Sequence, residues 1–136
     1  MRLVLDTNVV VSGLLWDGAP RSLLLIARDK RVDLITSLPL LAELTNILER
    51  PKFAKKIVAS TLTIDELVDR YAALAEMVRP TLTPRIAPDP DDDVVIGTAL
   101  AATASLIVTG DRALRSVAAH GDVRIVGVAE ALQIIG

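Results

Sequence analysis

The stretch DPDDDVVIGTALAATASLIVTGD, residues 89–111, carries the pattern that decides the fold. It opens with a cluster of aspartates, continues to Gly110 without an ionisable side chain, and closes on Asp111. The first half predicts a helix that begins at Asp92 or Asp93, and SLIVTGD (105–111) predicts a strand buried on both faces. The uncharged run is shorter than the ~20 residues of a membrane span, so we expect no membrane segment.

The alternation of strands and helices extends along the whole chain. It predicts a three-layer α/β/α sandwich with a mainly parallel central sheet, in a single domain over residues 1–136. We expect Thr7 or Asn8 to cap the first helix, Ser37 to cap the third, and Thr63 to form a capping box with Glu66. The predicted strands are 2–6, 32–37, 105–111 and 123–128, with a short edge strand and loop in 79–90. The predicted helices are 7–16, 21–29, 38–50, 63–78, 92–104 and 129–136, with a break and a short basic helix in 50–57 and a short helix and turn in 112–121.

Composition narrows the function classes. The chain has no cysteine, which excludes disulfides, thiolate metal sites and a cysteine nucleophile and fits a cytoplasmic protein. The N-terminal residues MRLVLDTN do not resemble a signal peptide. Hydrophobic residues make up 51% and the mean hydropathy is +0.48, from which we expect an apolar interface, as in a homodimer.

Carboxylates from distant parts of the sequence are expected at one edge of the sheet. Asp6 ends the first strand, Asp111 follows the third, and Glu43 lies in the helix after the second. The carboxyl ends of parallel strands share an edge, where ligands usually bind. Crowded carboxylates need a cation, and all-oxygen ligands select Mg²⁺ or Mn²⁺, which activate water for phosphate chemistry. With His120 as the one histidine, no Ser–His or Cys–His nucleophile can be assembled.

Simpler interpretations fit each acid taken singly. Asp6 and Asp111 suit helix N-caps, the DPDDD segment suits a solvated turn, and Glu43 suits a helix surface. A phosphatase or phosphotransfer domain also places an aspartate after its first strand. However, a receiver domain needs a late lysine, and none follows Lys56; a haloacid-dehalogenase-type phosphatase needs a second aspartate where Asn8 stands.

Four segments together resemble PIN-domain nucleases, and most closely the stand-alone toxins of type II toxin–antitoxin pairs. They are LVLDTNVVVS, LLAELTNILERPKF, the stretch DPDDDVVIGTALAATASLIVTGD and the closing VRIVGVAEALQII, which span nearly the whole chain. The resemblance implies an endoribonuclease that cleaves single-stranded RNA by metal-activated water, leaving a 3′-hydroxyl and a 5′-phosphate. It also implies an antitoxin partner. A catalytically inactive PIN-like scaffold is the alternative.

The resemblance also implies roles for individual residues. Asp6, Glu43, Asp93 and Asp111 would be catalytic and would ligate Mg²⁺ or Mn²⁺, with Asn8 and Thr109 in support. In the family the third acid stands three residues before an inward apolar position, and Asp93 stands three before Ile96. Asp92 would then be the helix cap and an additional candidate ligand.

Basic residues near these acids are candidate RNA contacts. They are Arg112 and Arg115 just after Asp111, with Arg50 and Lys52 after the Glu43 helix, and Arg21 is a further candidate. Lys52, Lys55 and Lys56 fit an ordinary solvated helix face equally well. The aromatic residues Trp16, Phe53 and Tyr71 are scattered in the sequence and expected to be packed, so no base-stacking platform is predicted.

Overall fold

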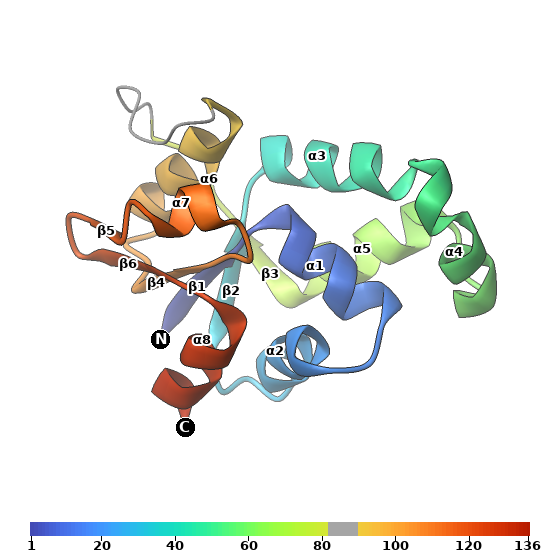
Figure 1. Ribbon diagram of the computed structural model, residues 1–136, viewed down its shortest axis with the longest axis horizontal. Helices are drawn as coiled ribbons and strands as arrows, with labels where there is room; N and C mark the ends of the chain where they lie inside the picture. The colour runs from blue at the N-terminus through green and yellow to red at the C-terminus, as the bar shows by residue number, and fades with distance from the viewer. Residues whose placement is uncertain (82–89) are drawn as a thin grey trace.

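The computed structural model describes residues 1–81 and 90–136, with side chains described from residue 92 in the second range. Its centre is a six-stranded sheet in the order β3-β2-β1-β4-β6-β5, in which only β5 runs antiparallel to its neighbour (Figure 1). The mainly parallel sheet predicted from the sequence is confirmed. The strands are β1 (Arg2–Leu5), β2 (Asp33–Thr36), β3 (Ala75–Met77), β4 (Leu106–Val108), β5 (Ala119–His120) and β6 (Val123–Val126).

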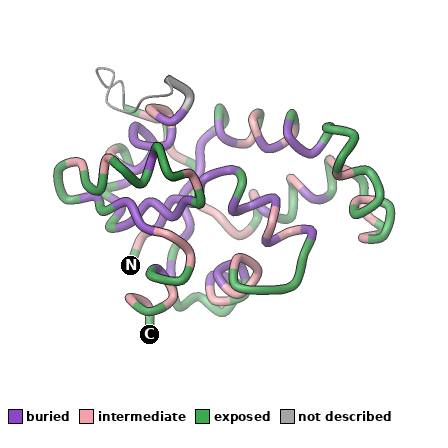
Figure 2. Tube along the Cα trace, in the orientation of Figure 1, coloured by how far each residue is buried: buried purple, intermediate pink, exposed green. Residues whose placement is uncertain are grey.

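Helices cover both faces of the sheet. Side chains alternate along β1, so Leu3 and Leu5 pack on one face and Val4 on the other. The first face packs against α1, α2, α3, α5 and α8, and the second mainly against α6 and α7, which confirms the three-layer sandwich (Figures 1 and 2). The helices are α1 (Thr7–Leu15), α2 (Ala19–Arg28), α3 (Leu38–Leu48), η1 (Pro51–Phe53), α4 (Ala54–Ser60), α5 (Ile64–Leu74), α6 (Pro90–Ala101), α7 (Arg112–Arg115) and α8 (Val128–Ile135).

The sheet is buried in its middle. Leu3, Val4, Ile35, Ile107 and Val108 are fully buried, as expected for central parallel strands covered on both faces. Figure 2 shows the buried residues concentrated in the strands and on the inner sides of the helices. Across the described residues, no single helix is long and apolar enough to cross a membrane, and only α1 with α2, bent by 89° at their break, reaches that length as a pair.

Several local predictions were wrong. The helix predicted over 63–78 ends at Leu74, because the chain turns into the short edge strand β3 beside β2. Residues Ala119–His120 form the strand β5, where a helix and turn were expected. The predicted edge strand and loop over 79–90 falls mostly outside the described residues.

The helix caps also differ in part from expectation. Asp6 caps α1 in place of Thr7 or Asn8, because its carboxylate accepts the Thr7 N–H. Helix α6 begins at Pro90, so Asp92 lies within the first turn and is not its cap. Ser37 is the N-cap of α3, as expected, but its side chain makes no cap hydrogen bond. The capping box of Thr63 and Glu66 is confirmed by both of its hydrogen bonds.

Candidate active site at the carboxyl edge of the sheet

Two neighbouring parallel strands bring Asp6 and Thr109 together. Leu5 at the end of β1 pairs with Val108 at the end of β4, and the Asp6 N–H donates to the Val108 carbonyl at 2.9 Å. The residues that follow, Asp6 and Thr109, therefore leave the sheet side by side. Although they are 103 positions apart in sequence, the strand register alone makes them neighbours.

A short chain of hydrogen bonds joins Asp6 to Asp111. The Asp111 N–H donates to Thr109 Oγ1 at 3.0 Å, and the Thr109 hydroxyl donates to Asp6 Oδ2 at 2.6 Å. Asp6 Oδ1 accepts the Thr7 N–H at 2.8 Å, and Asp111 Oδ1 accepts the Ala113 N–H at 2.8 Å. Both acids are thus held by the N-termini of the helices that follow them, as the N-cap interpretation predicted.

The Asp6 carboxylate is electrostatically unfavourable in the absence of a cation. The residue is 5% exposed, and this burial raises the pKa of Asp6 above its ordinary value because the charged form loses its hydration. The hydrogen bonds from Thr109 and Thr7 lower that pKa, whereas the negative charge of Asp111 raises it further. A positive charge placed between the two acids would relieve both the desolvation and the repulsion.

The helices that carry Glu43 and Asp93 meet near this edge. Ser37, directly before α3, hydrogen-bonds through its hydroxyl to the Thr98 hydroxyl of α6 at 3.0 Å, and both residues are fully buried. Glu43 lines a hollow of about 280 Å³ with Val94, the residue after Asp93. This buried hydroxyl pair was not predicted from the sequence, because Ser37 was interpreted only as a helix cap and Thr98 lies 61 positions away.

The described residues contain no group of three or more acids or histidines already close enough to hold a metal ion. The structure brings Asp6 and Asp111 together; the four-acid ligand set stays a prediction. Asp92 is 9% exposed and Asp93 is half-buried, so burial does not favour Asp93 as the third ligand. Asn8 is exposed in the first turn of α1, and among the described residues no hydrogen bond joins it to Asp6.

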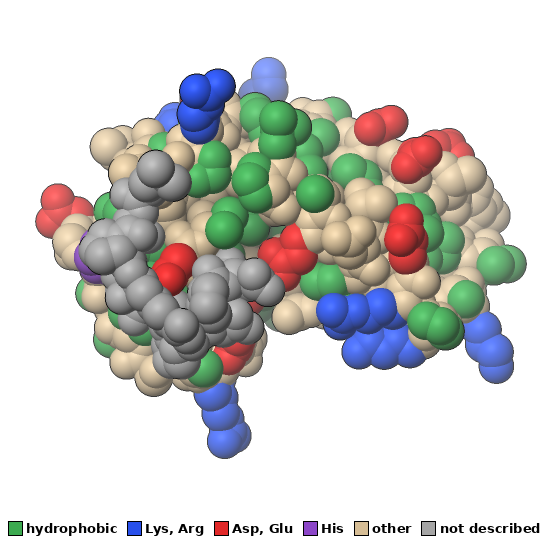
Figure 3. Space-filling view, turned by 90° about the horizontal axis from the view of Figure 1, so that it is seen from above, with side chains coloured by type: hydrophobic (Ala, Val, Ile, Leu, Met, Phe, Trp, Pro, Cys, Tyr) green, Lys and Arg blue, Asp and Glu red, His purple; other side chains and the backbone are tan. Residues whose placement is uncertain are grey.

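The carboxyl edge carries charge of both signs. Figure 3 looks onto this face and shows acidic side chains near its middle and basic side chains at its margins. Arg112 and Arg115 are exposed on α7, one and four positions after Asp111. The Arg115 guanidinium packs close to Gly127. Arg21, by contrast, donates to the carbonyls of Gly13 and Leu14 and pairs with Asp17, so its guanidinium anchors the end of α1.

The expectation that the aromatic residues are scattered was wrong for Trp16 and Phe53, and the expectation that they are packed was wrong for Trp16 alone. The rings of Trp16 and Phe53 meet edge to face with their centroids 6.0 Å apart. Trp16 is 38% exposed, whereas Tyr71 is buried in the core, as expected. The contact could not be predicted from the sequence, because 37 positions separate the two residues and no local pattern links them.

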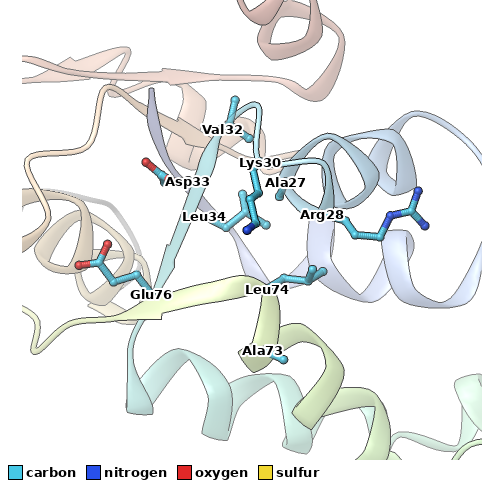
Figure 4. A pocket seen from close by; sticks show the side chains of 9 residues that line it. All are labelled: Ala27, Arg28, Lys30, Val32, Asp33, Leu34, Ala73, Leu74 and Glu76. Carbon is cyan, nitrogen blue, oxygen red and sulfur yellow. The ribbon is translucent and has the colours of Figure 1, made fainter.

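A second hollow, of about 320 Å³, lies at the opposite edge of the sheet (Figure 4). Arg28, Lys30, Asp33 and Glu76 surround it near the amino ends of β2 and β3. The Glu76 carboxylate pairs with Arg2 at 3.0 Å. This hollow is remote from the carboxyl ends of the strands, where parallel sheets place their ligands, so we assign the candidate site to the acidic edge.

Sequence comparison identifies the family to which this fold and its acidic edge belong. The sequence matches the family model of the PIN domain over residues 2–113. The chain belongs to the PIN-domain family, whose members are generally nucleases. No curated protein gives a significant match.

One similar solved structure is the crystal structure of VapBC2 from Rickettsia felis bound to a DNA fragment from their promoter. The similarity has a TM-score of 0.61 at 16% sequence identity, and it covers 93% of this chain and 98% of that chain. At this identity the comparison establishes the shared fold.

The donor set suits a hard divalent cation. Asp6 and Asp111 offer carboxylate oxygens, Thr109 orients one of them, and no thiolate ligand is available in a chain without cysteine. The raised pKa of Asp6 supplies the electrostatic reason for a cation at this point. The residues present therefore fit Mg²⁺ or Mn²⁺.

Proposed function

We propose that the chain is a Mg²⁺- or Mn²⁺-dependent endoribonuclease that hydrolyses single-stranded RNA. The observation that supports it best is the buried Asp6 carboxylate, fixed by Thr109 beside Asp111 at the carboxyl edge of a PIN-domain sheet. Glu43 and Asp93, on helices α3 and α6 that meet at this edge, complete the proposed ligand set.

Each residue of the proposed site has a separate role in binding the cation or the RNA. Asp6 and Asp111 hold the cation, and Thr109 keeps the Asp6 carboxylate in one orientation by donating to Oδ2. A bound divalent ion supplies Lewis-acid activation of the phosphodiester and lowers the pKa of a water. Arg112, exposed next to Asp111, is placed to contact an RNA phosphate.

Biologically, we propose that the chain is the toxin of a type II toxin–antitoxin pair and acts in the cytoplasm. Support comes from the shared fold with a chain of the VapBC2 structure and from the PIN-domain match. Expression of the chain alone should then arrest growth, and the Asp6→Asn variant should not. Growth arrest by both would attribute toxicity to something other than the acidic site.

We further propose a homodimer. Leu38 and Met77 are 70% and 46% exposed, and they line an apolar hollow of about 480 Å³ with Pro39, Val78 and Pro80 beside the edge strand β3. Burial of this surface against a second copy would account for the high apolar content. Sedimentation should show a dimer that Leu38→Asp dissociates; a monomeric wild-type protein at micromolar concentration would refute it.

Cleavage assays test the nuclease proposal. A panel of single-stranded RNAs is incubated with the protein and Mn²⁺, with EDTA as the metal-free control. The expected products carry 5′-phosphates, and they should be absent with EDTA. A protein that folds, binds Mn²⁺ and leaves every RNA intact would support the catalytically inactive scaffold.

A further inference from the structure

Two aromatic rings and two lysines form a compact surface where α1 ends against η1 and α4. It consists of Trp16, Lys52, Phe53 and Lys56, and we term it the aromatic–lysine patch. Beyond the contact of the two rings, the Lys52 ammonium lies 5.1 Å from the centre of the Phe53 ring, and the Lys56 ammonium lies 5.4 Å from that of Trp16. A lysine ammonium therefore lies over the face of each ring.

Phe53 packs partly against the core, but core packing does not account for the exposure of Trp16 or for the two lysines. Both lysines are exposed, Phe53 is half-buried and Trp16 keeps 38% of its surface in solvent, whereas core residues such as Leu44 and Leu48 keep 1%. Cation–π contacts at exposed sites are weak, so a flat ligand can displace either ammonium from its ring. The displaced ammonium would remain within reach of any anion attached to that ligand.

The patch matches the chemistry of a single nucleic-acid strand. Unpaired bases stack on aromatic rings, and the phosphates between them attract lysines. Arg50 and Lys55 add positive charge in the same segment, and they outweigh the neighbouring acid Glu49. Asp17 follows Trp16, but its carboxylate is paired with Arg21 at 2.6 Å. The excess positive charge favours an RNA strand over an apolar protein partner.

Helix α1 connects the patch to the candidate active site. Asp6 caps its start, and Trp16 follows its last residue, Leu15. The nine residues of α1 rise about 14 Å, which a strand stacked at ~3.4 Å per nucleotide covers in about four nucleotides. Figure 1 shows α1 running from the carboxyl edge of the sheet toward α4.

Building on the proposed ribonuclease function, we propose that the aromatic–lysine patch binds the single-stranded RNA substrate a few nucleotides from the scissile phosphate. Trp16 and Phe53 stack bases, while Lys52 and Lys56 hold the adjoining phosphates. Because every base has a flat face, the patch contributes affinity and positioning with little sequence preference.

Trp16 is the only tryptophan in the chain, so its fluorescence reports directly on the patch. The wild-type protein in EDTA is titrated with a short oligouridylate, which cannot be cleaved without metal. We expect quenching of Trp16, and affinity that falls as salt rises. Unchanged fluorescence on saturation with RNA, measured in parallel by the anisotropy of labelled RNA, would overturn the proposal.

Variants separate stacking from structural effects. Trp16→Ala should weaken RNA binding by about 5- to 150-fold, as expected for loss of a base–aromatic stack, while Trp16→Phe should retain most of the affinity. Val58→Ala, on α4 and 78% exposed, is the matched control and should bind as the wild type does. Melting curves confirm that each variant is folded.

The outcomes distinguish this proposal from the nuclease proposal. RNA binding that depends on Trp16, without cleavage in Mn²⁺, would support the aromatic–lysine patch as an RNA site and refute the nuclease proposal. Cleavage in Mn²⁺, together with an RNA affinity of Trp16→Ala within twofold of wild type, would support the nuclease proposal and refute the patch as an RNA site. Weakened binding of a protein partner with intact RNA binding would assign the patch to that partner and overturn it as an RNA site.

Discussion

Replacing Thr109 by valine tests the hydrogen-bonded core of the site. Valine keeps the shape of threonine but cannot donate to Asp6 Oδ2 or accept from the Asp111 N–H. A hydrogen bond to a charged group contributes ~1.5–3 kcal/mol, and the lost acceptor for the half-buried Asp111 N–H adds ~0.5–1 kcal/mol. We therefore expect Thr109→Val to lower the free energy of unfolding by about 2–4 kcal/mol.

The same change should appear as a melting shift. An unfolding entropy of ~2.1 cal/mol/K per residue gives ~0.29 kcal/mol/K for 136 residues, so Tm should fall by about 7–14 °C. The pKa of Asp6 should also rise further, because one of the contacts that lower it is gone.

Urea denaturation in EDTA measures the effect, with Thr45→Val as the matched control. The Thr45 hydroxyl donates to the neutral Leu41 carbonyl within α3, so its loss should cost little. In an Asp6→Asn background, Thr109→Val should cost less than in the wild type, because the charged acceptor is absent. Equal costs at positions 109 and 45 would refute the reasoning.

Three other changes test the same account. Mn²⁺ at about a hundred times its Kd should stabilise the fold by ~2.7 kcal/mol. This stabilisation should decrease as the pH drops through the raised pKa of Asp6, because protons compete with the ion. Calorimetry that shows no metal effect at neutral pH would count against the site. Because the pKa of Asp6 is raised in the fold, its ionised carboxylate destabilises the metal-free protein above that pKa, and this destabilisation is lost as the pH falls toward 3.8. Asp6→Asn should therefore raise the metal-free Tm at neutral pH and remove the Mn²⁺ shift. A lower Tm would show that the buried carboxylate does not destabilise the fold. Gly97→Ala should destabilise the protein by ~1–3 kcal/mol, because the added Cβ would collide with the Thr81 carbonyl that packs on α6. Gly110→Ala, whose Cβ meets open space, is the control and should be tolerated. Equal stability of the two variants would contradict this packing.

The sequence predicted the parts of the site that depend on strands. Asp6 and Asp111 each follow a short apolar run, and burial on both faces of a parallel sheet leaves the next polar residue at the carboxyl edge. Their proximity then needs only that β1 and β4 are neighbours, which the pairing of Leu5 with Val108 confirms. The general architecture followed from the same alternation of strands and helices.

Features that depend on helix packing could not be predicted. The position of Glu43 relative to Asp93 is set by how α3 and α6 pack, and the Ser37–Thr98 hydrogen bond between them joins residues 61 positions apart. The strand Ala75–Met77 continues the helical spacing of α5, and only its pairing with β2 ends the helix at Leu74. The contact of Trp16 with Phe53 likewise arises from tertiary packing alone.

Metal-dependent RNA cleavage by the wild type and by Asp6→Asn is the most direct test of the central claim. Both proteins are incubated with a single-stranded RNA and Mn²⁺ after their folding is verified by melting curves. The wild type should produce fragments with 5′-phosphates, and Asp6→Asn should leave the RNA intact because it lacks the carboxylate that Thr109 orients. Cleavage of the RNA by folded Asp6→Asn at the wild-type rate would contradict the metal mechanism.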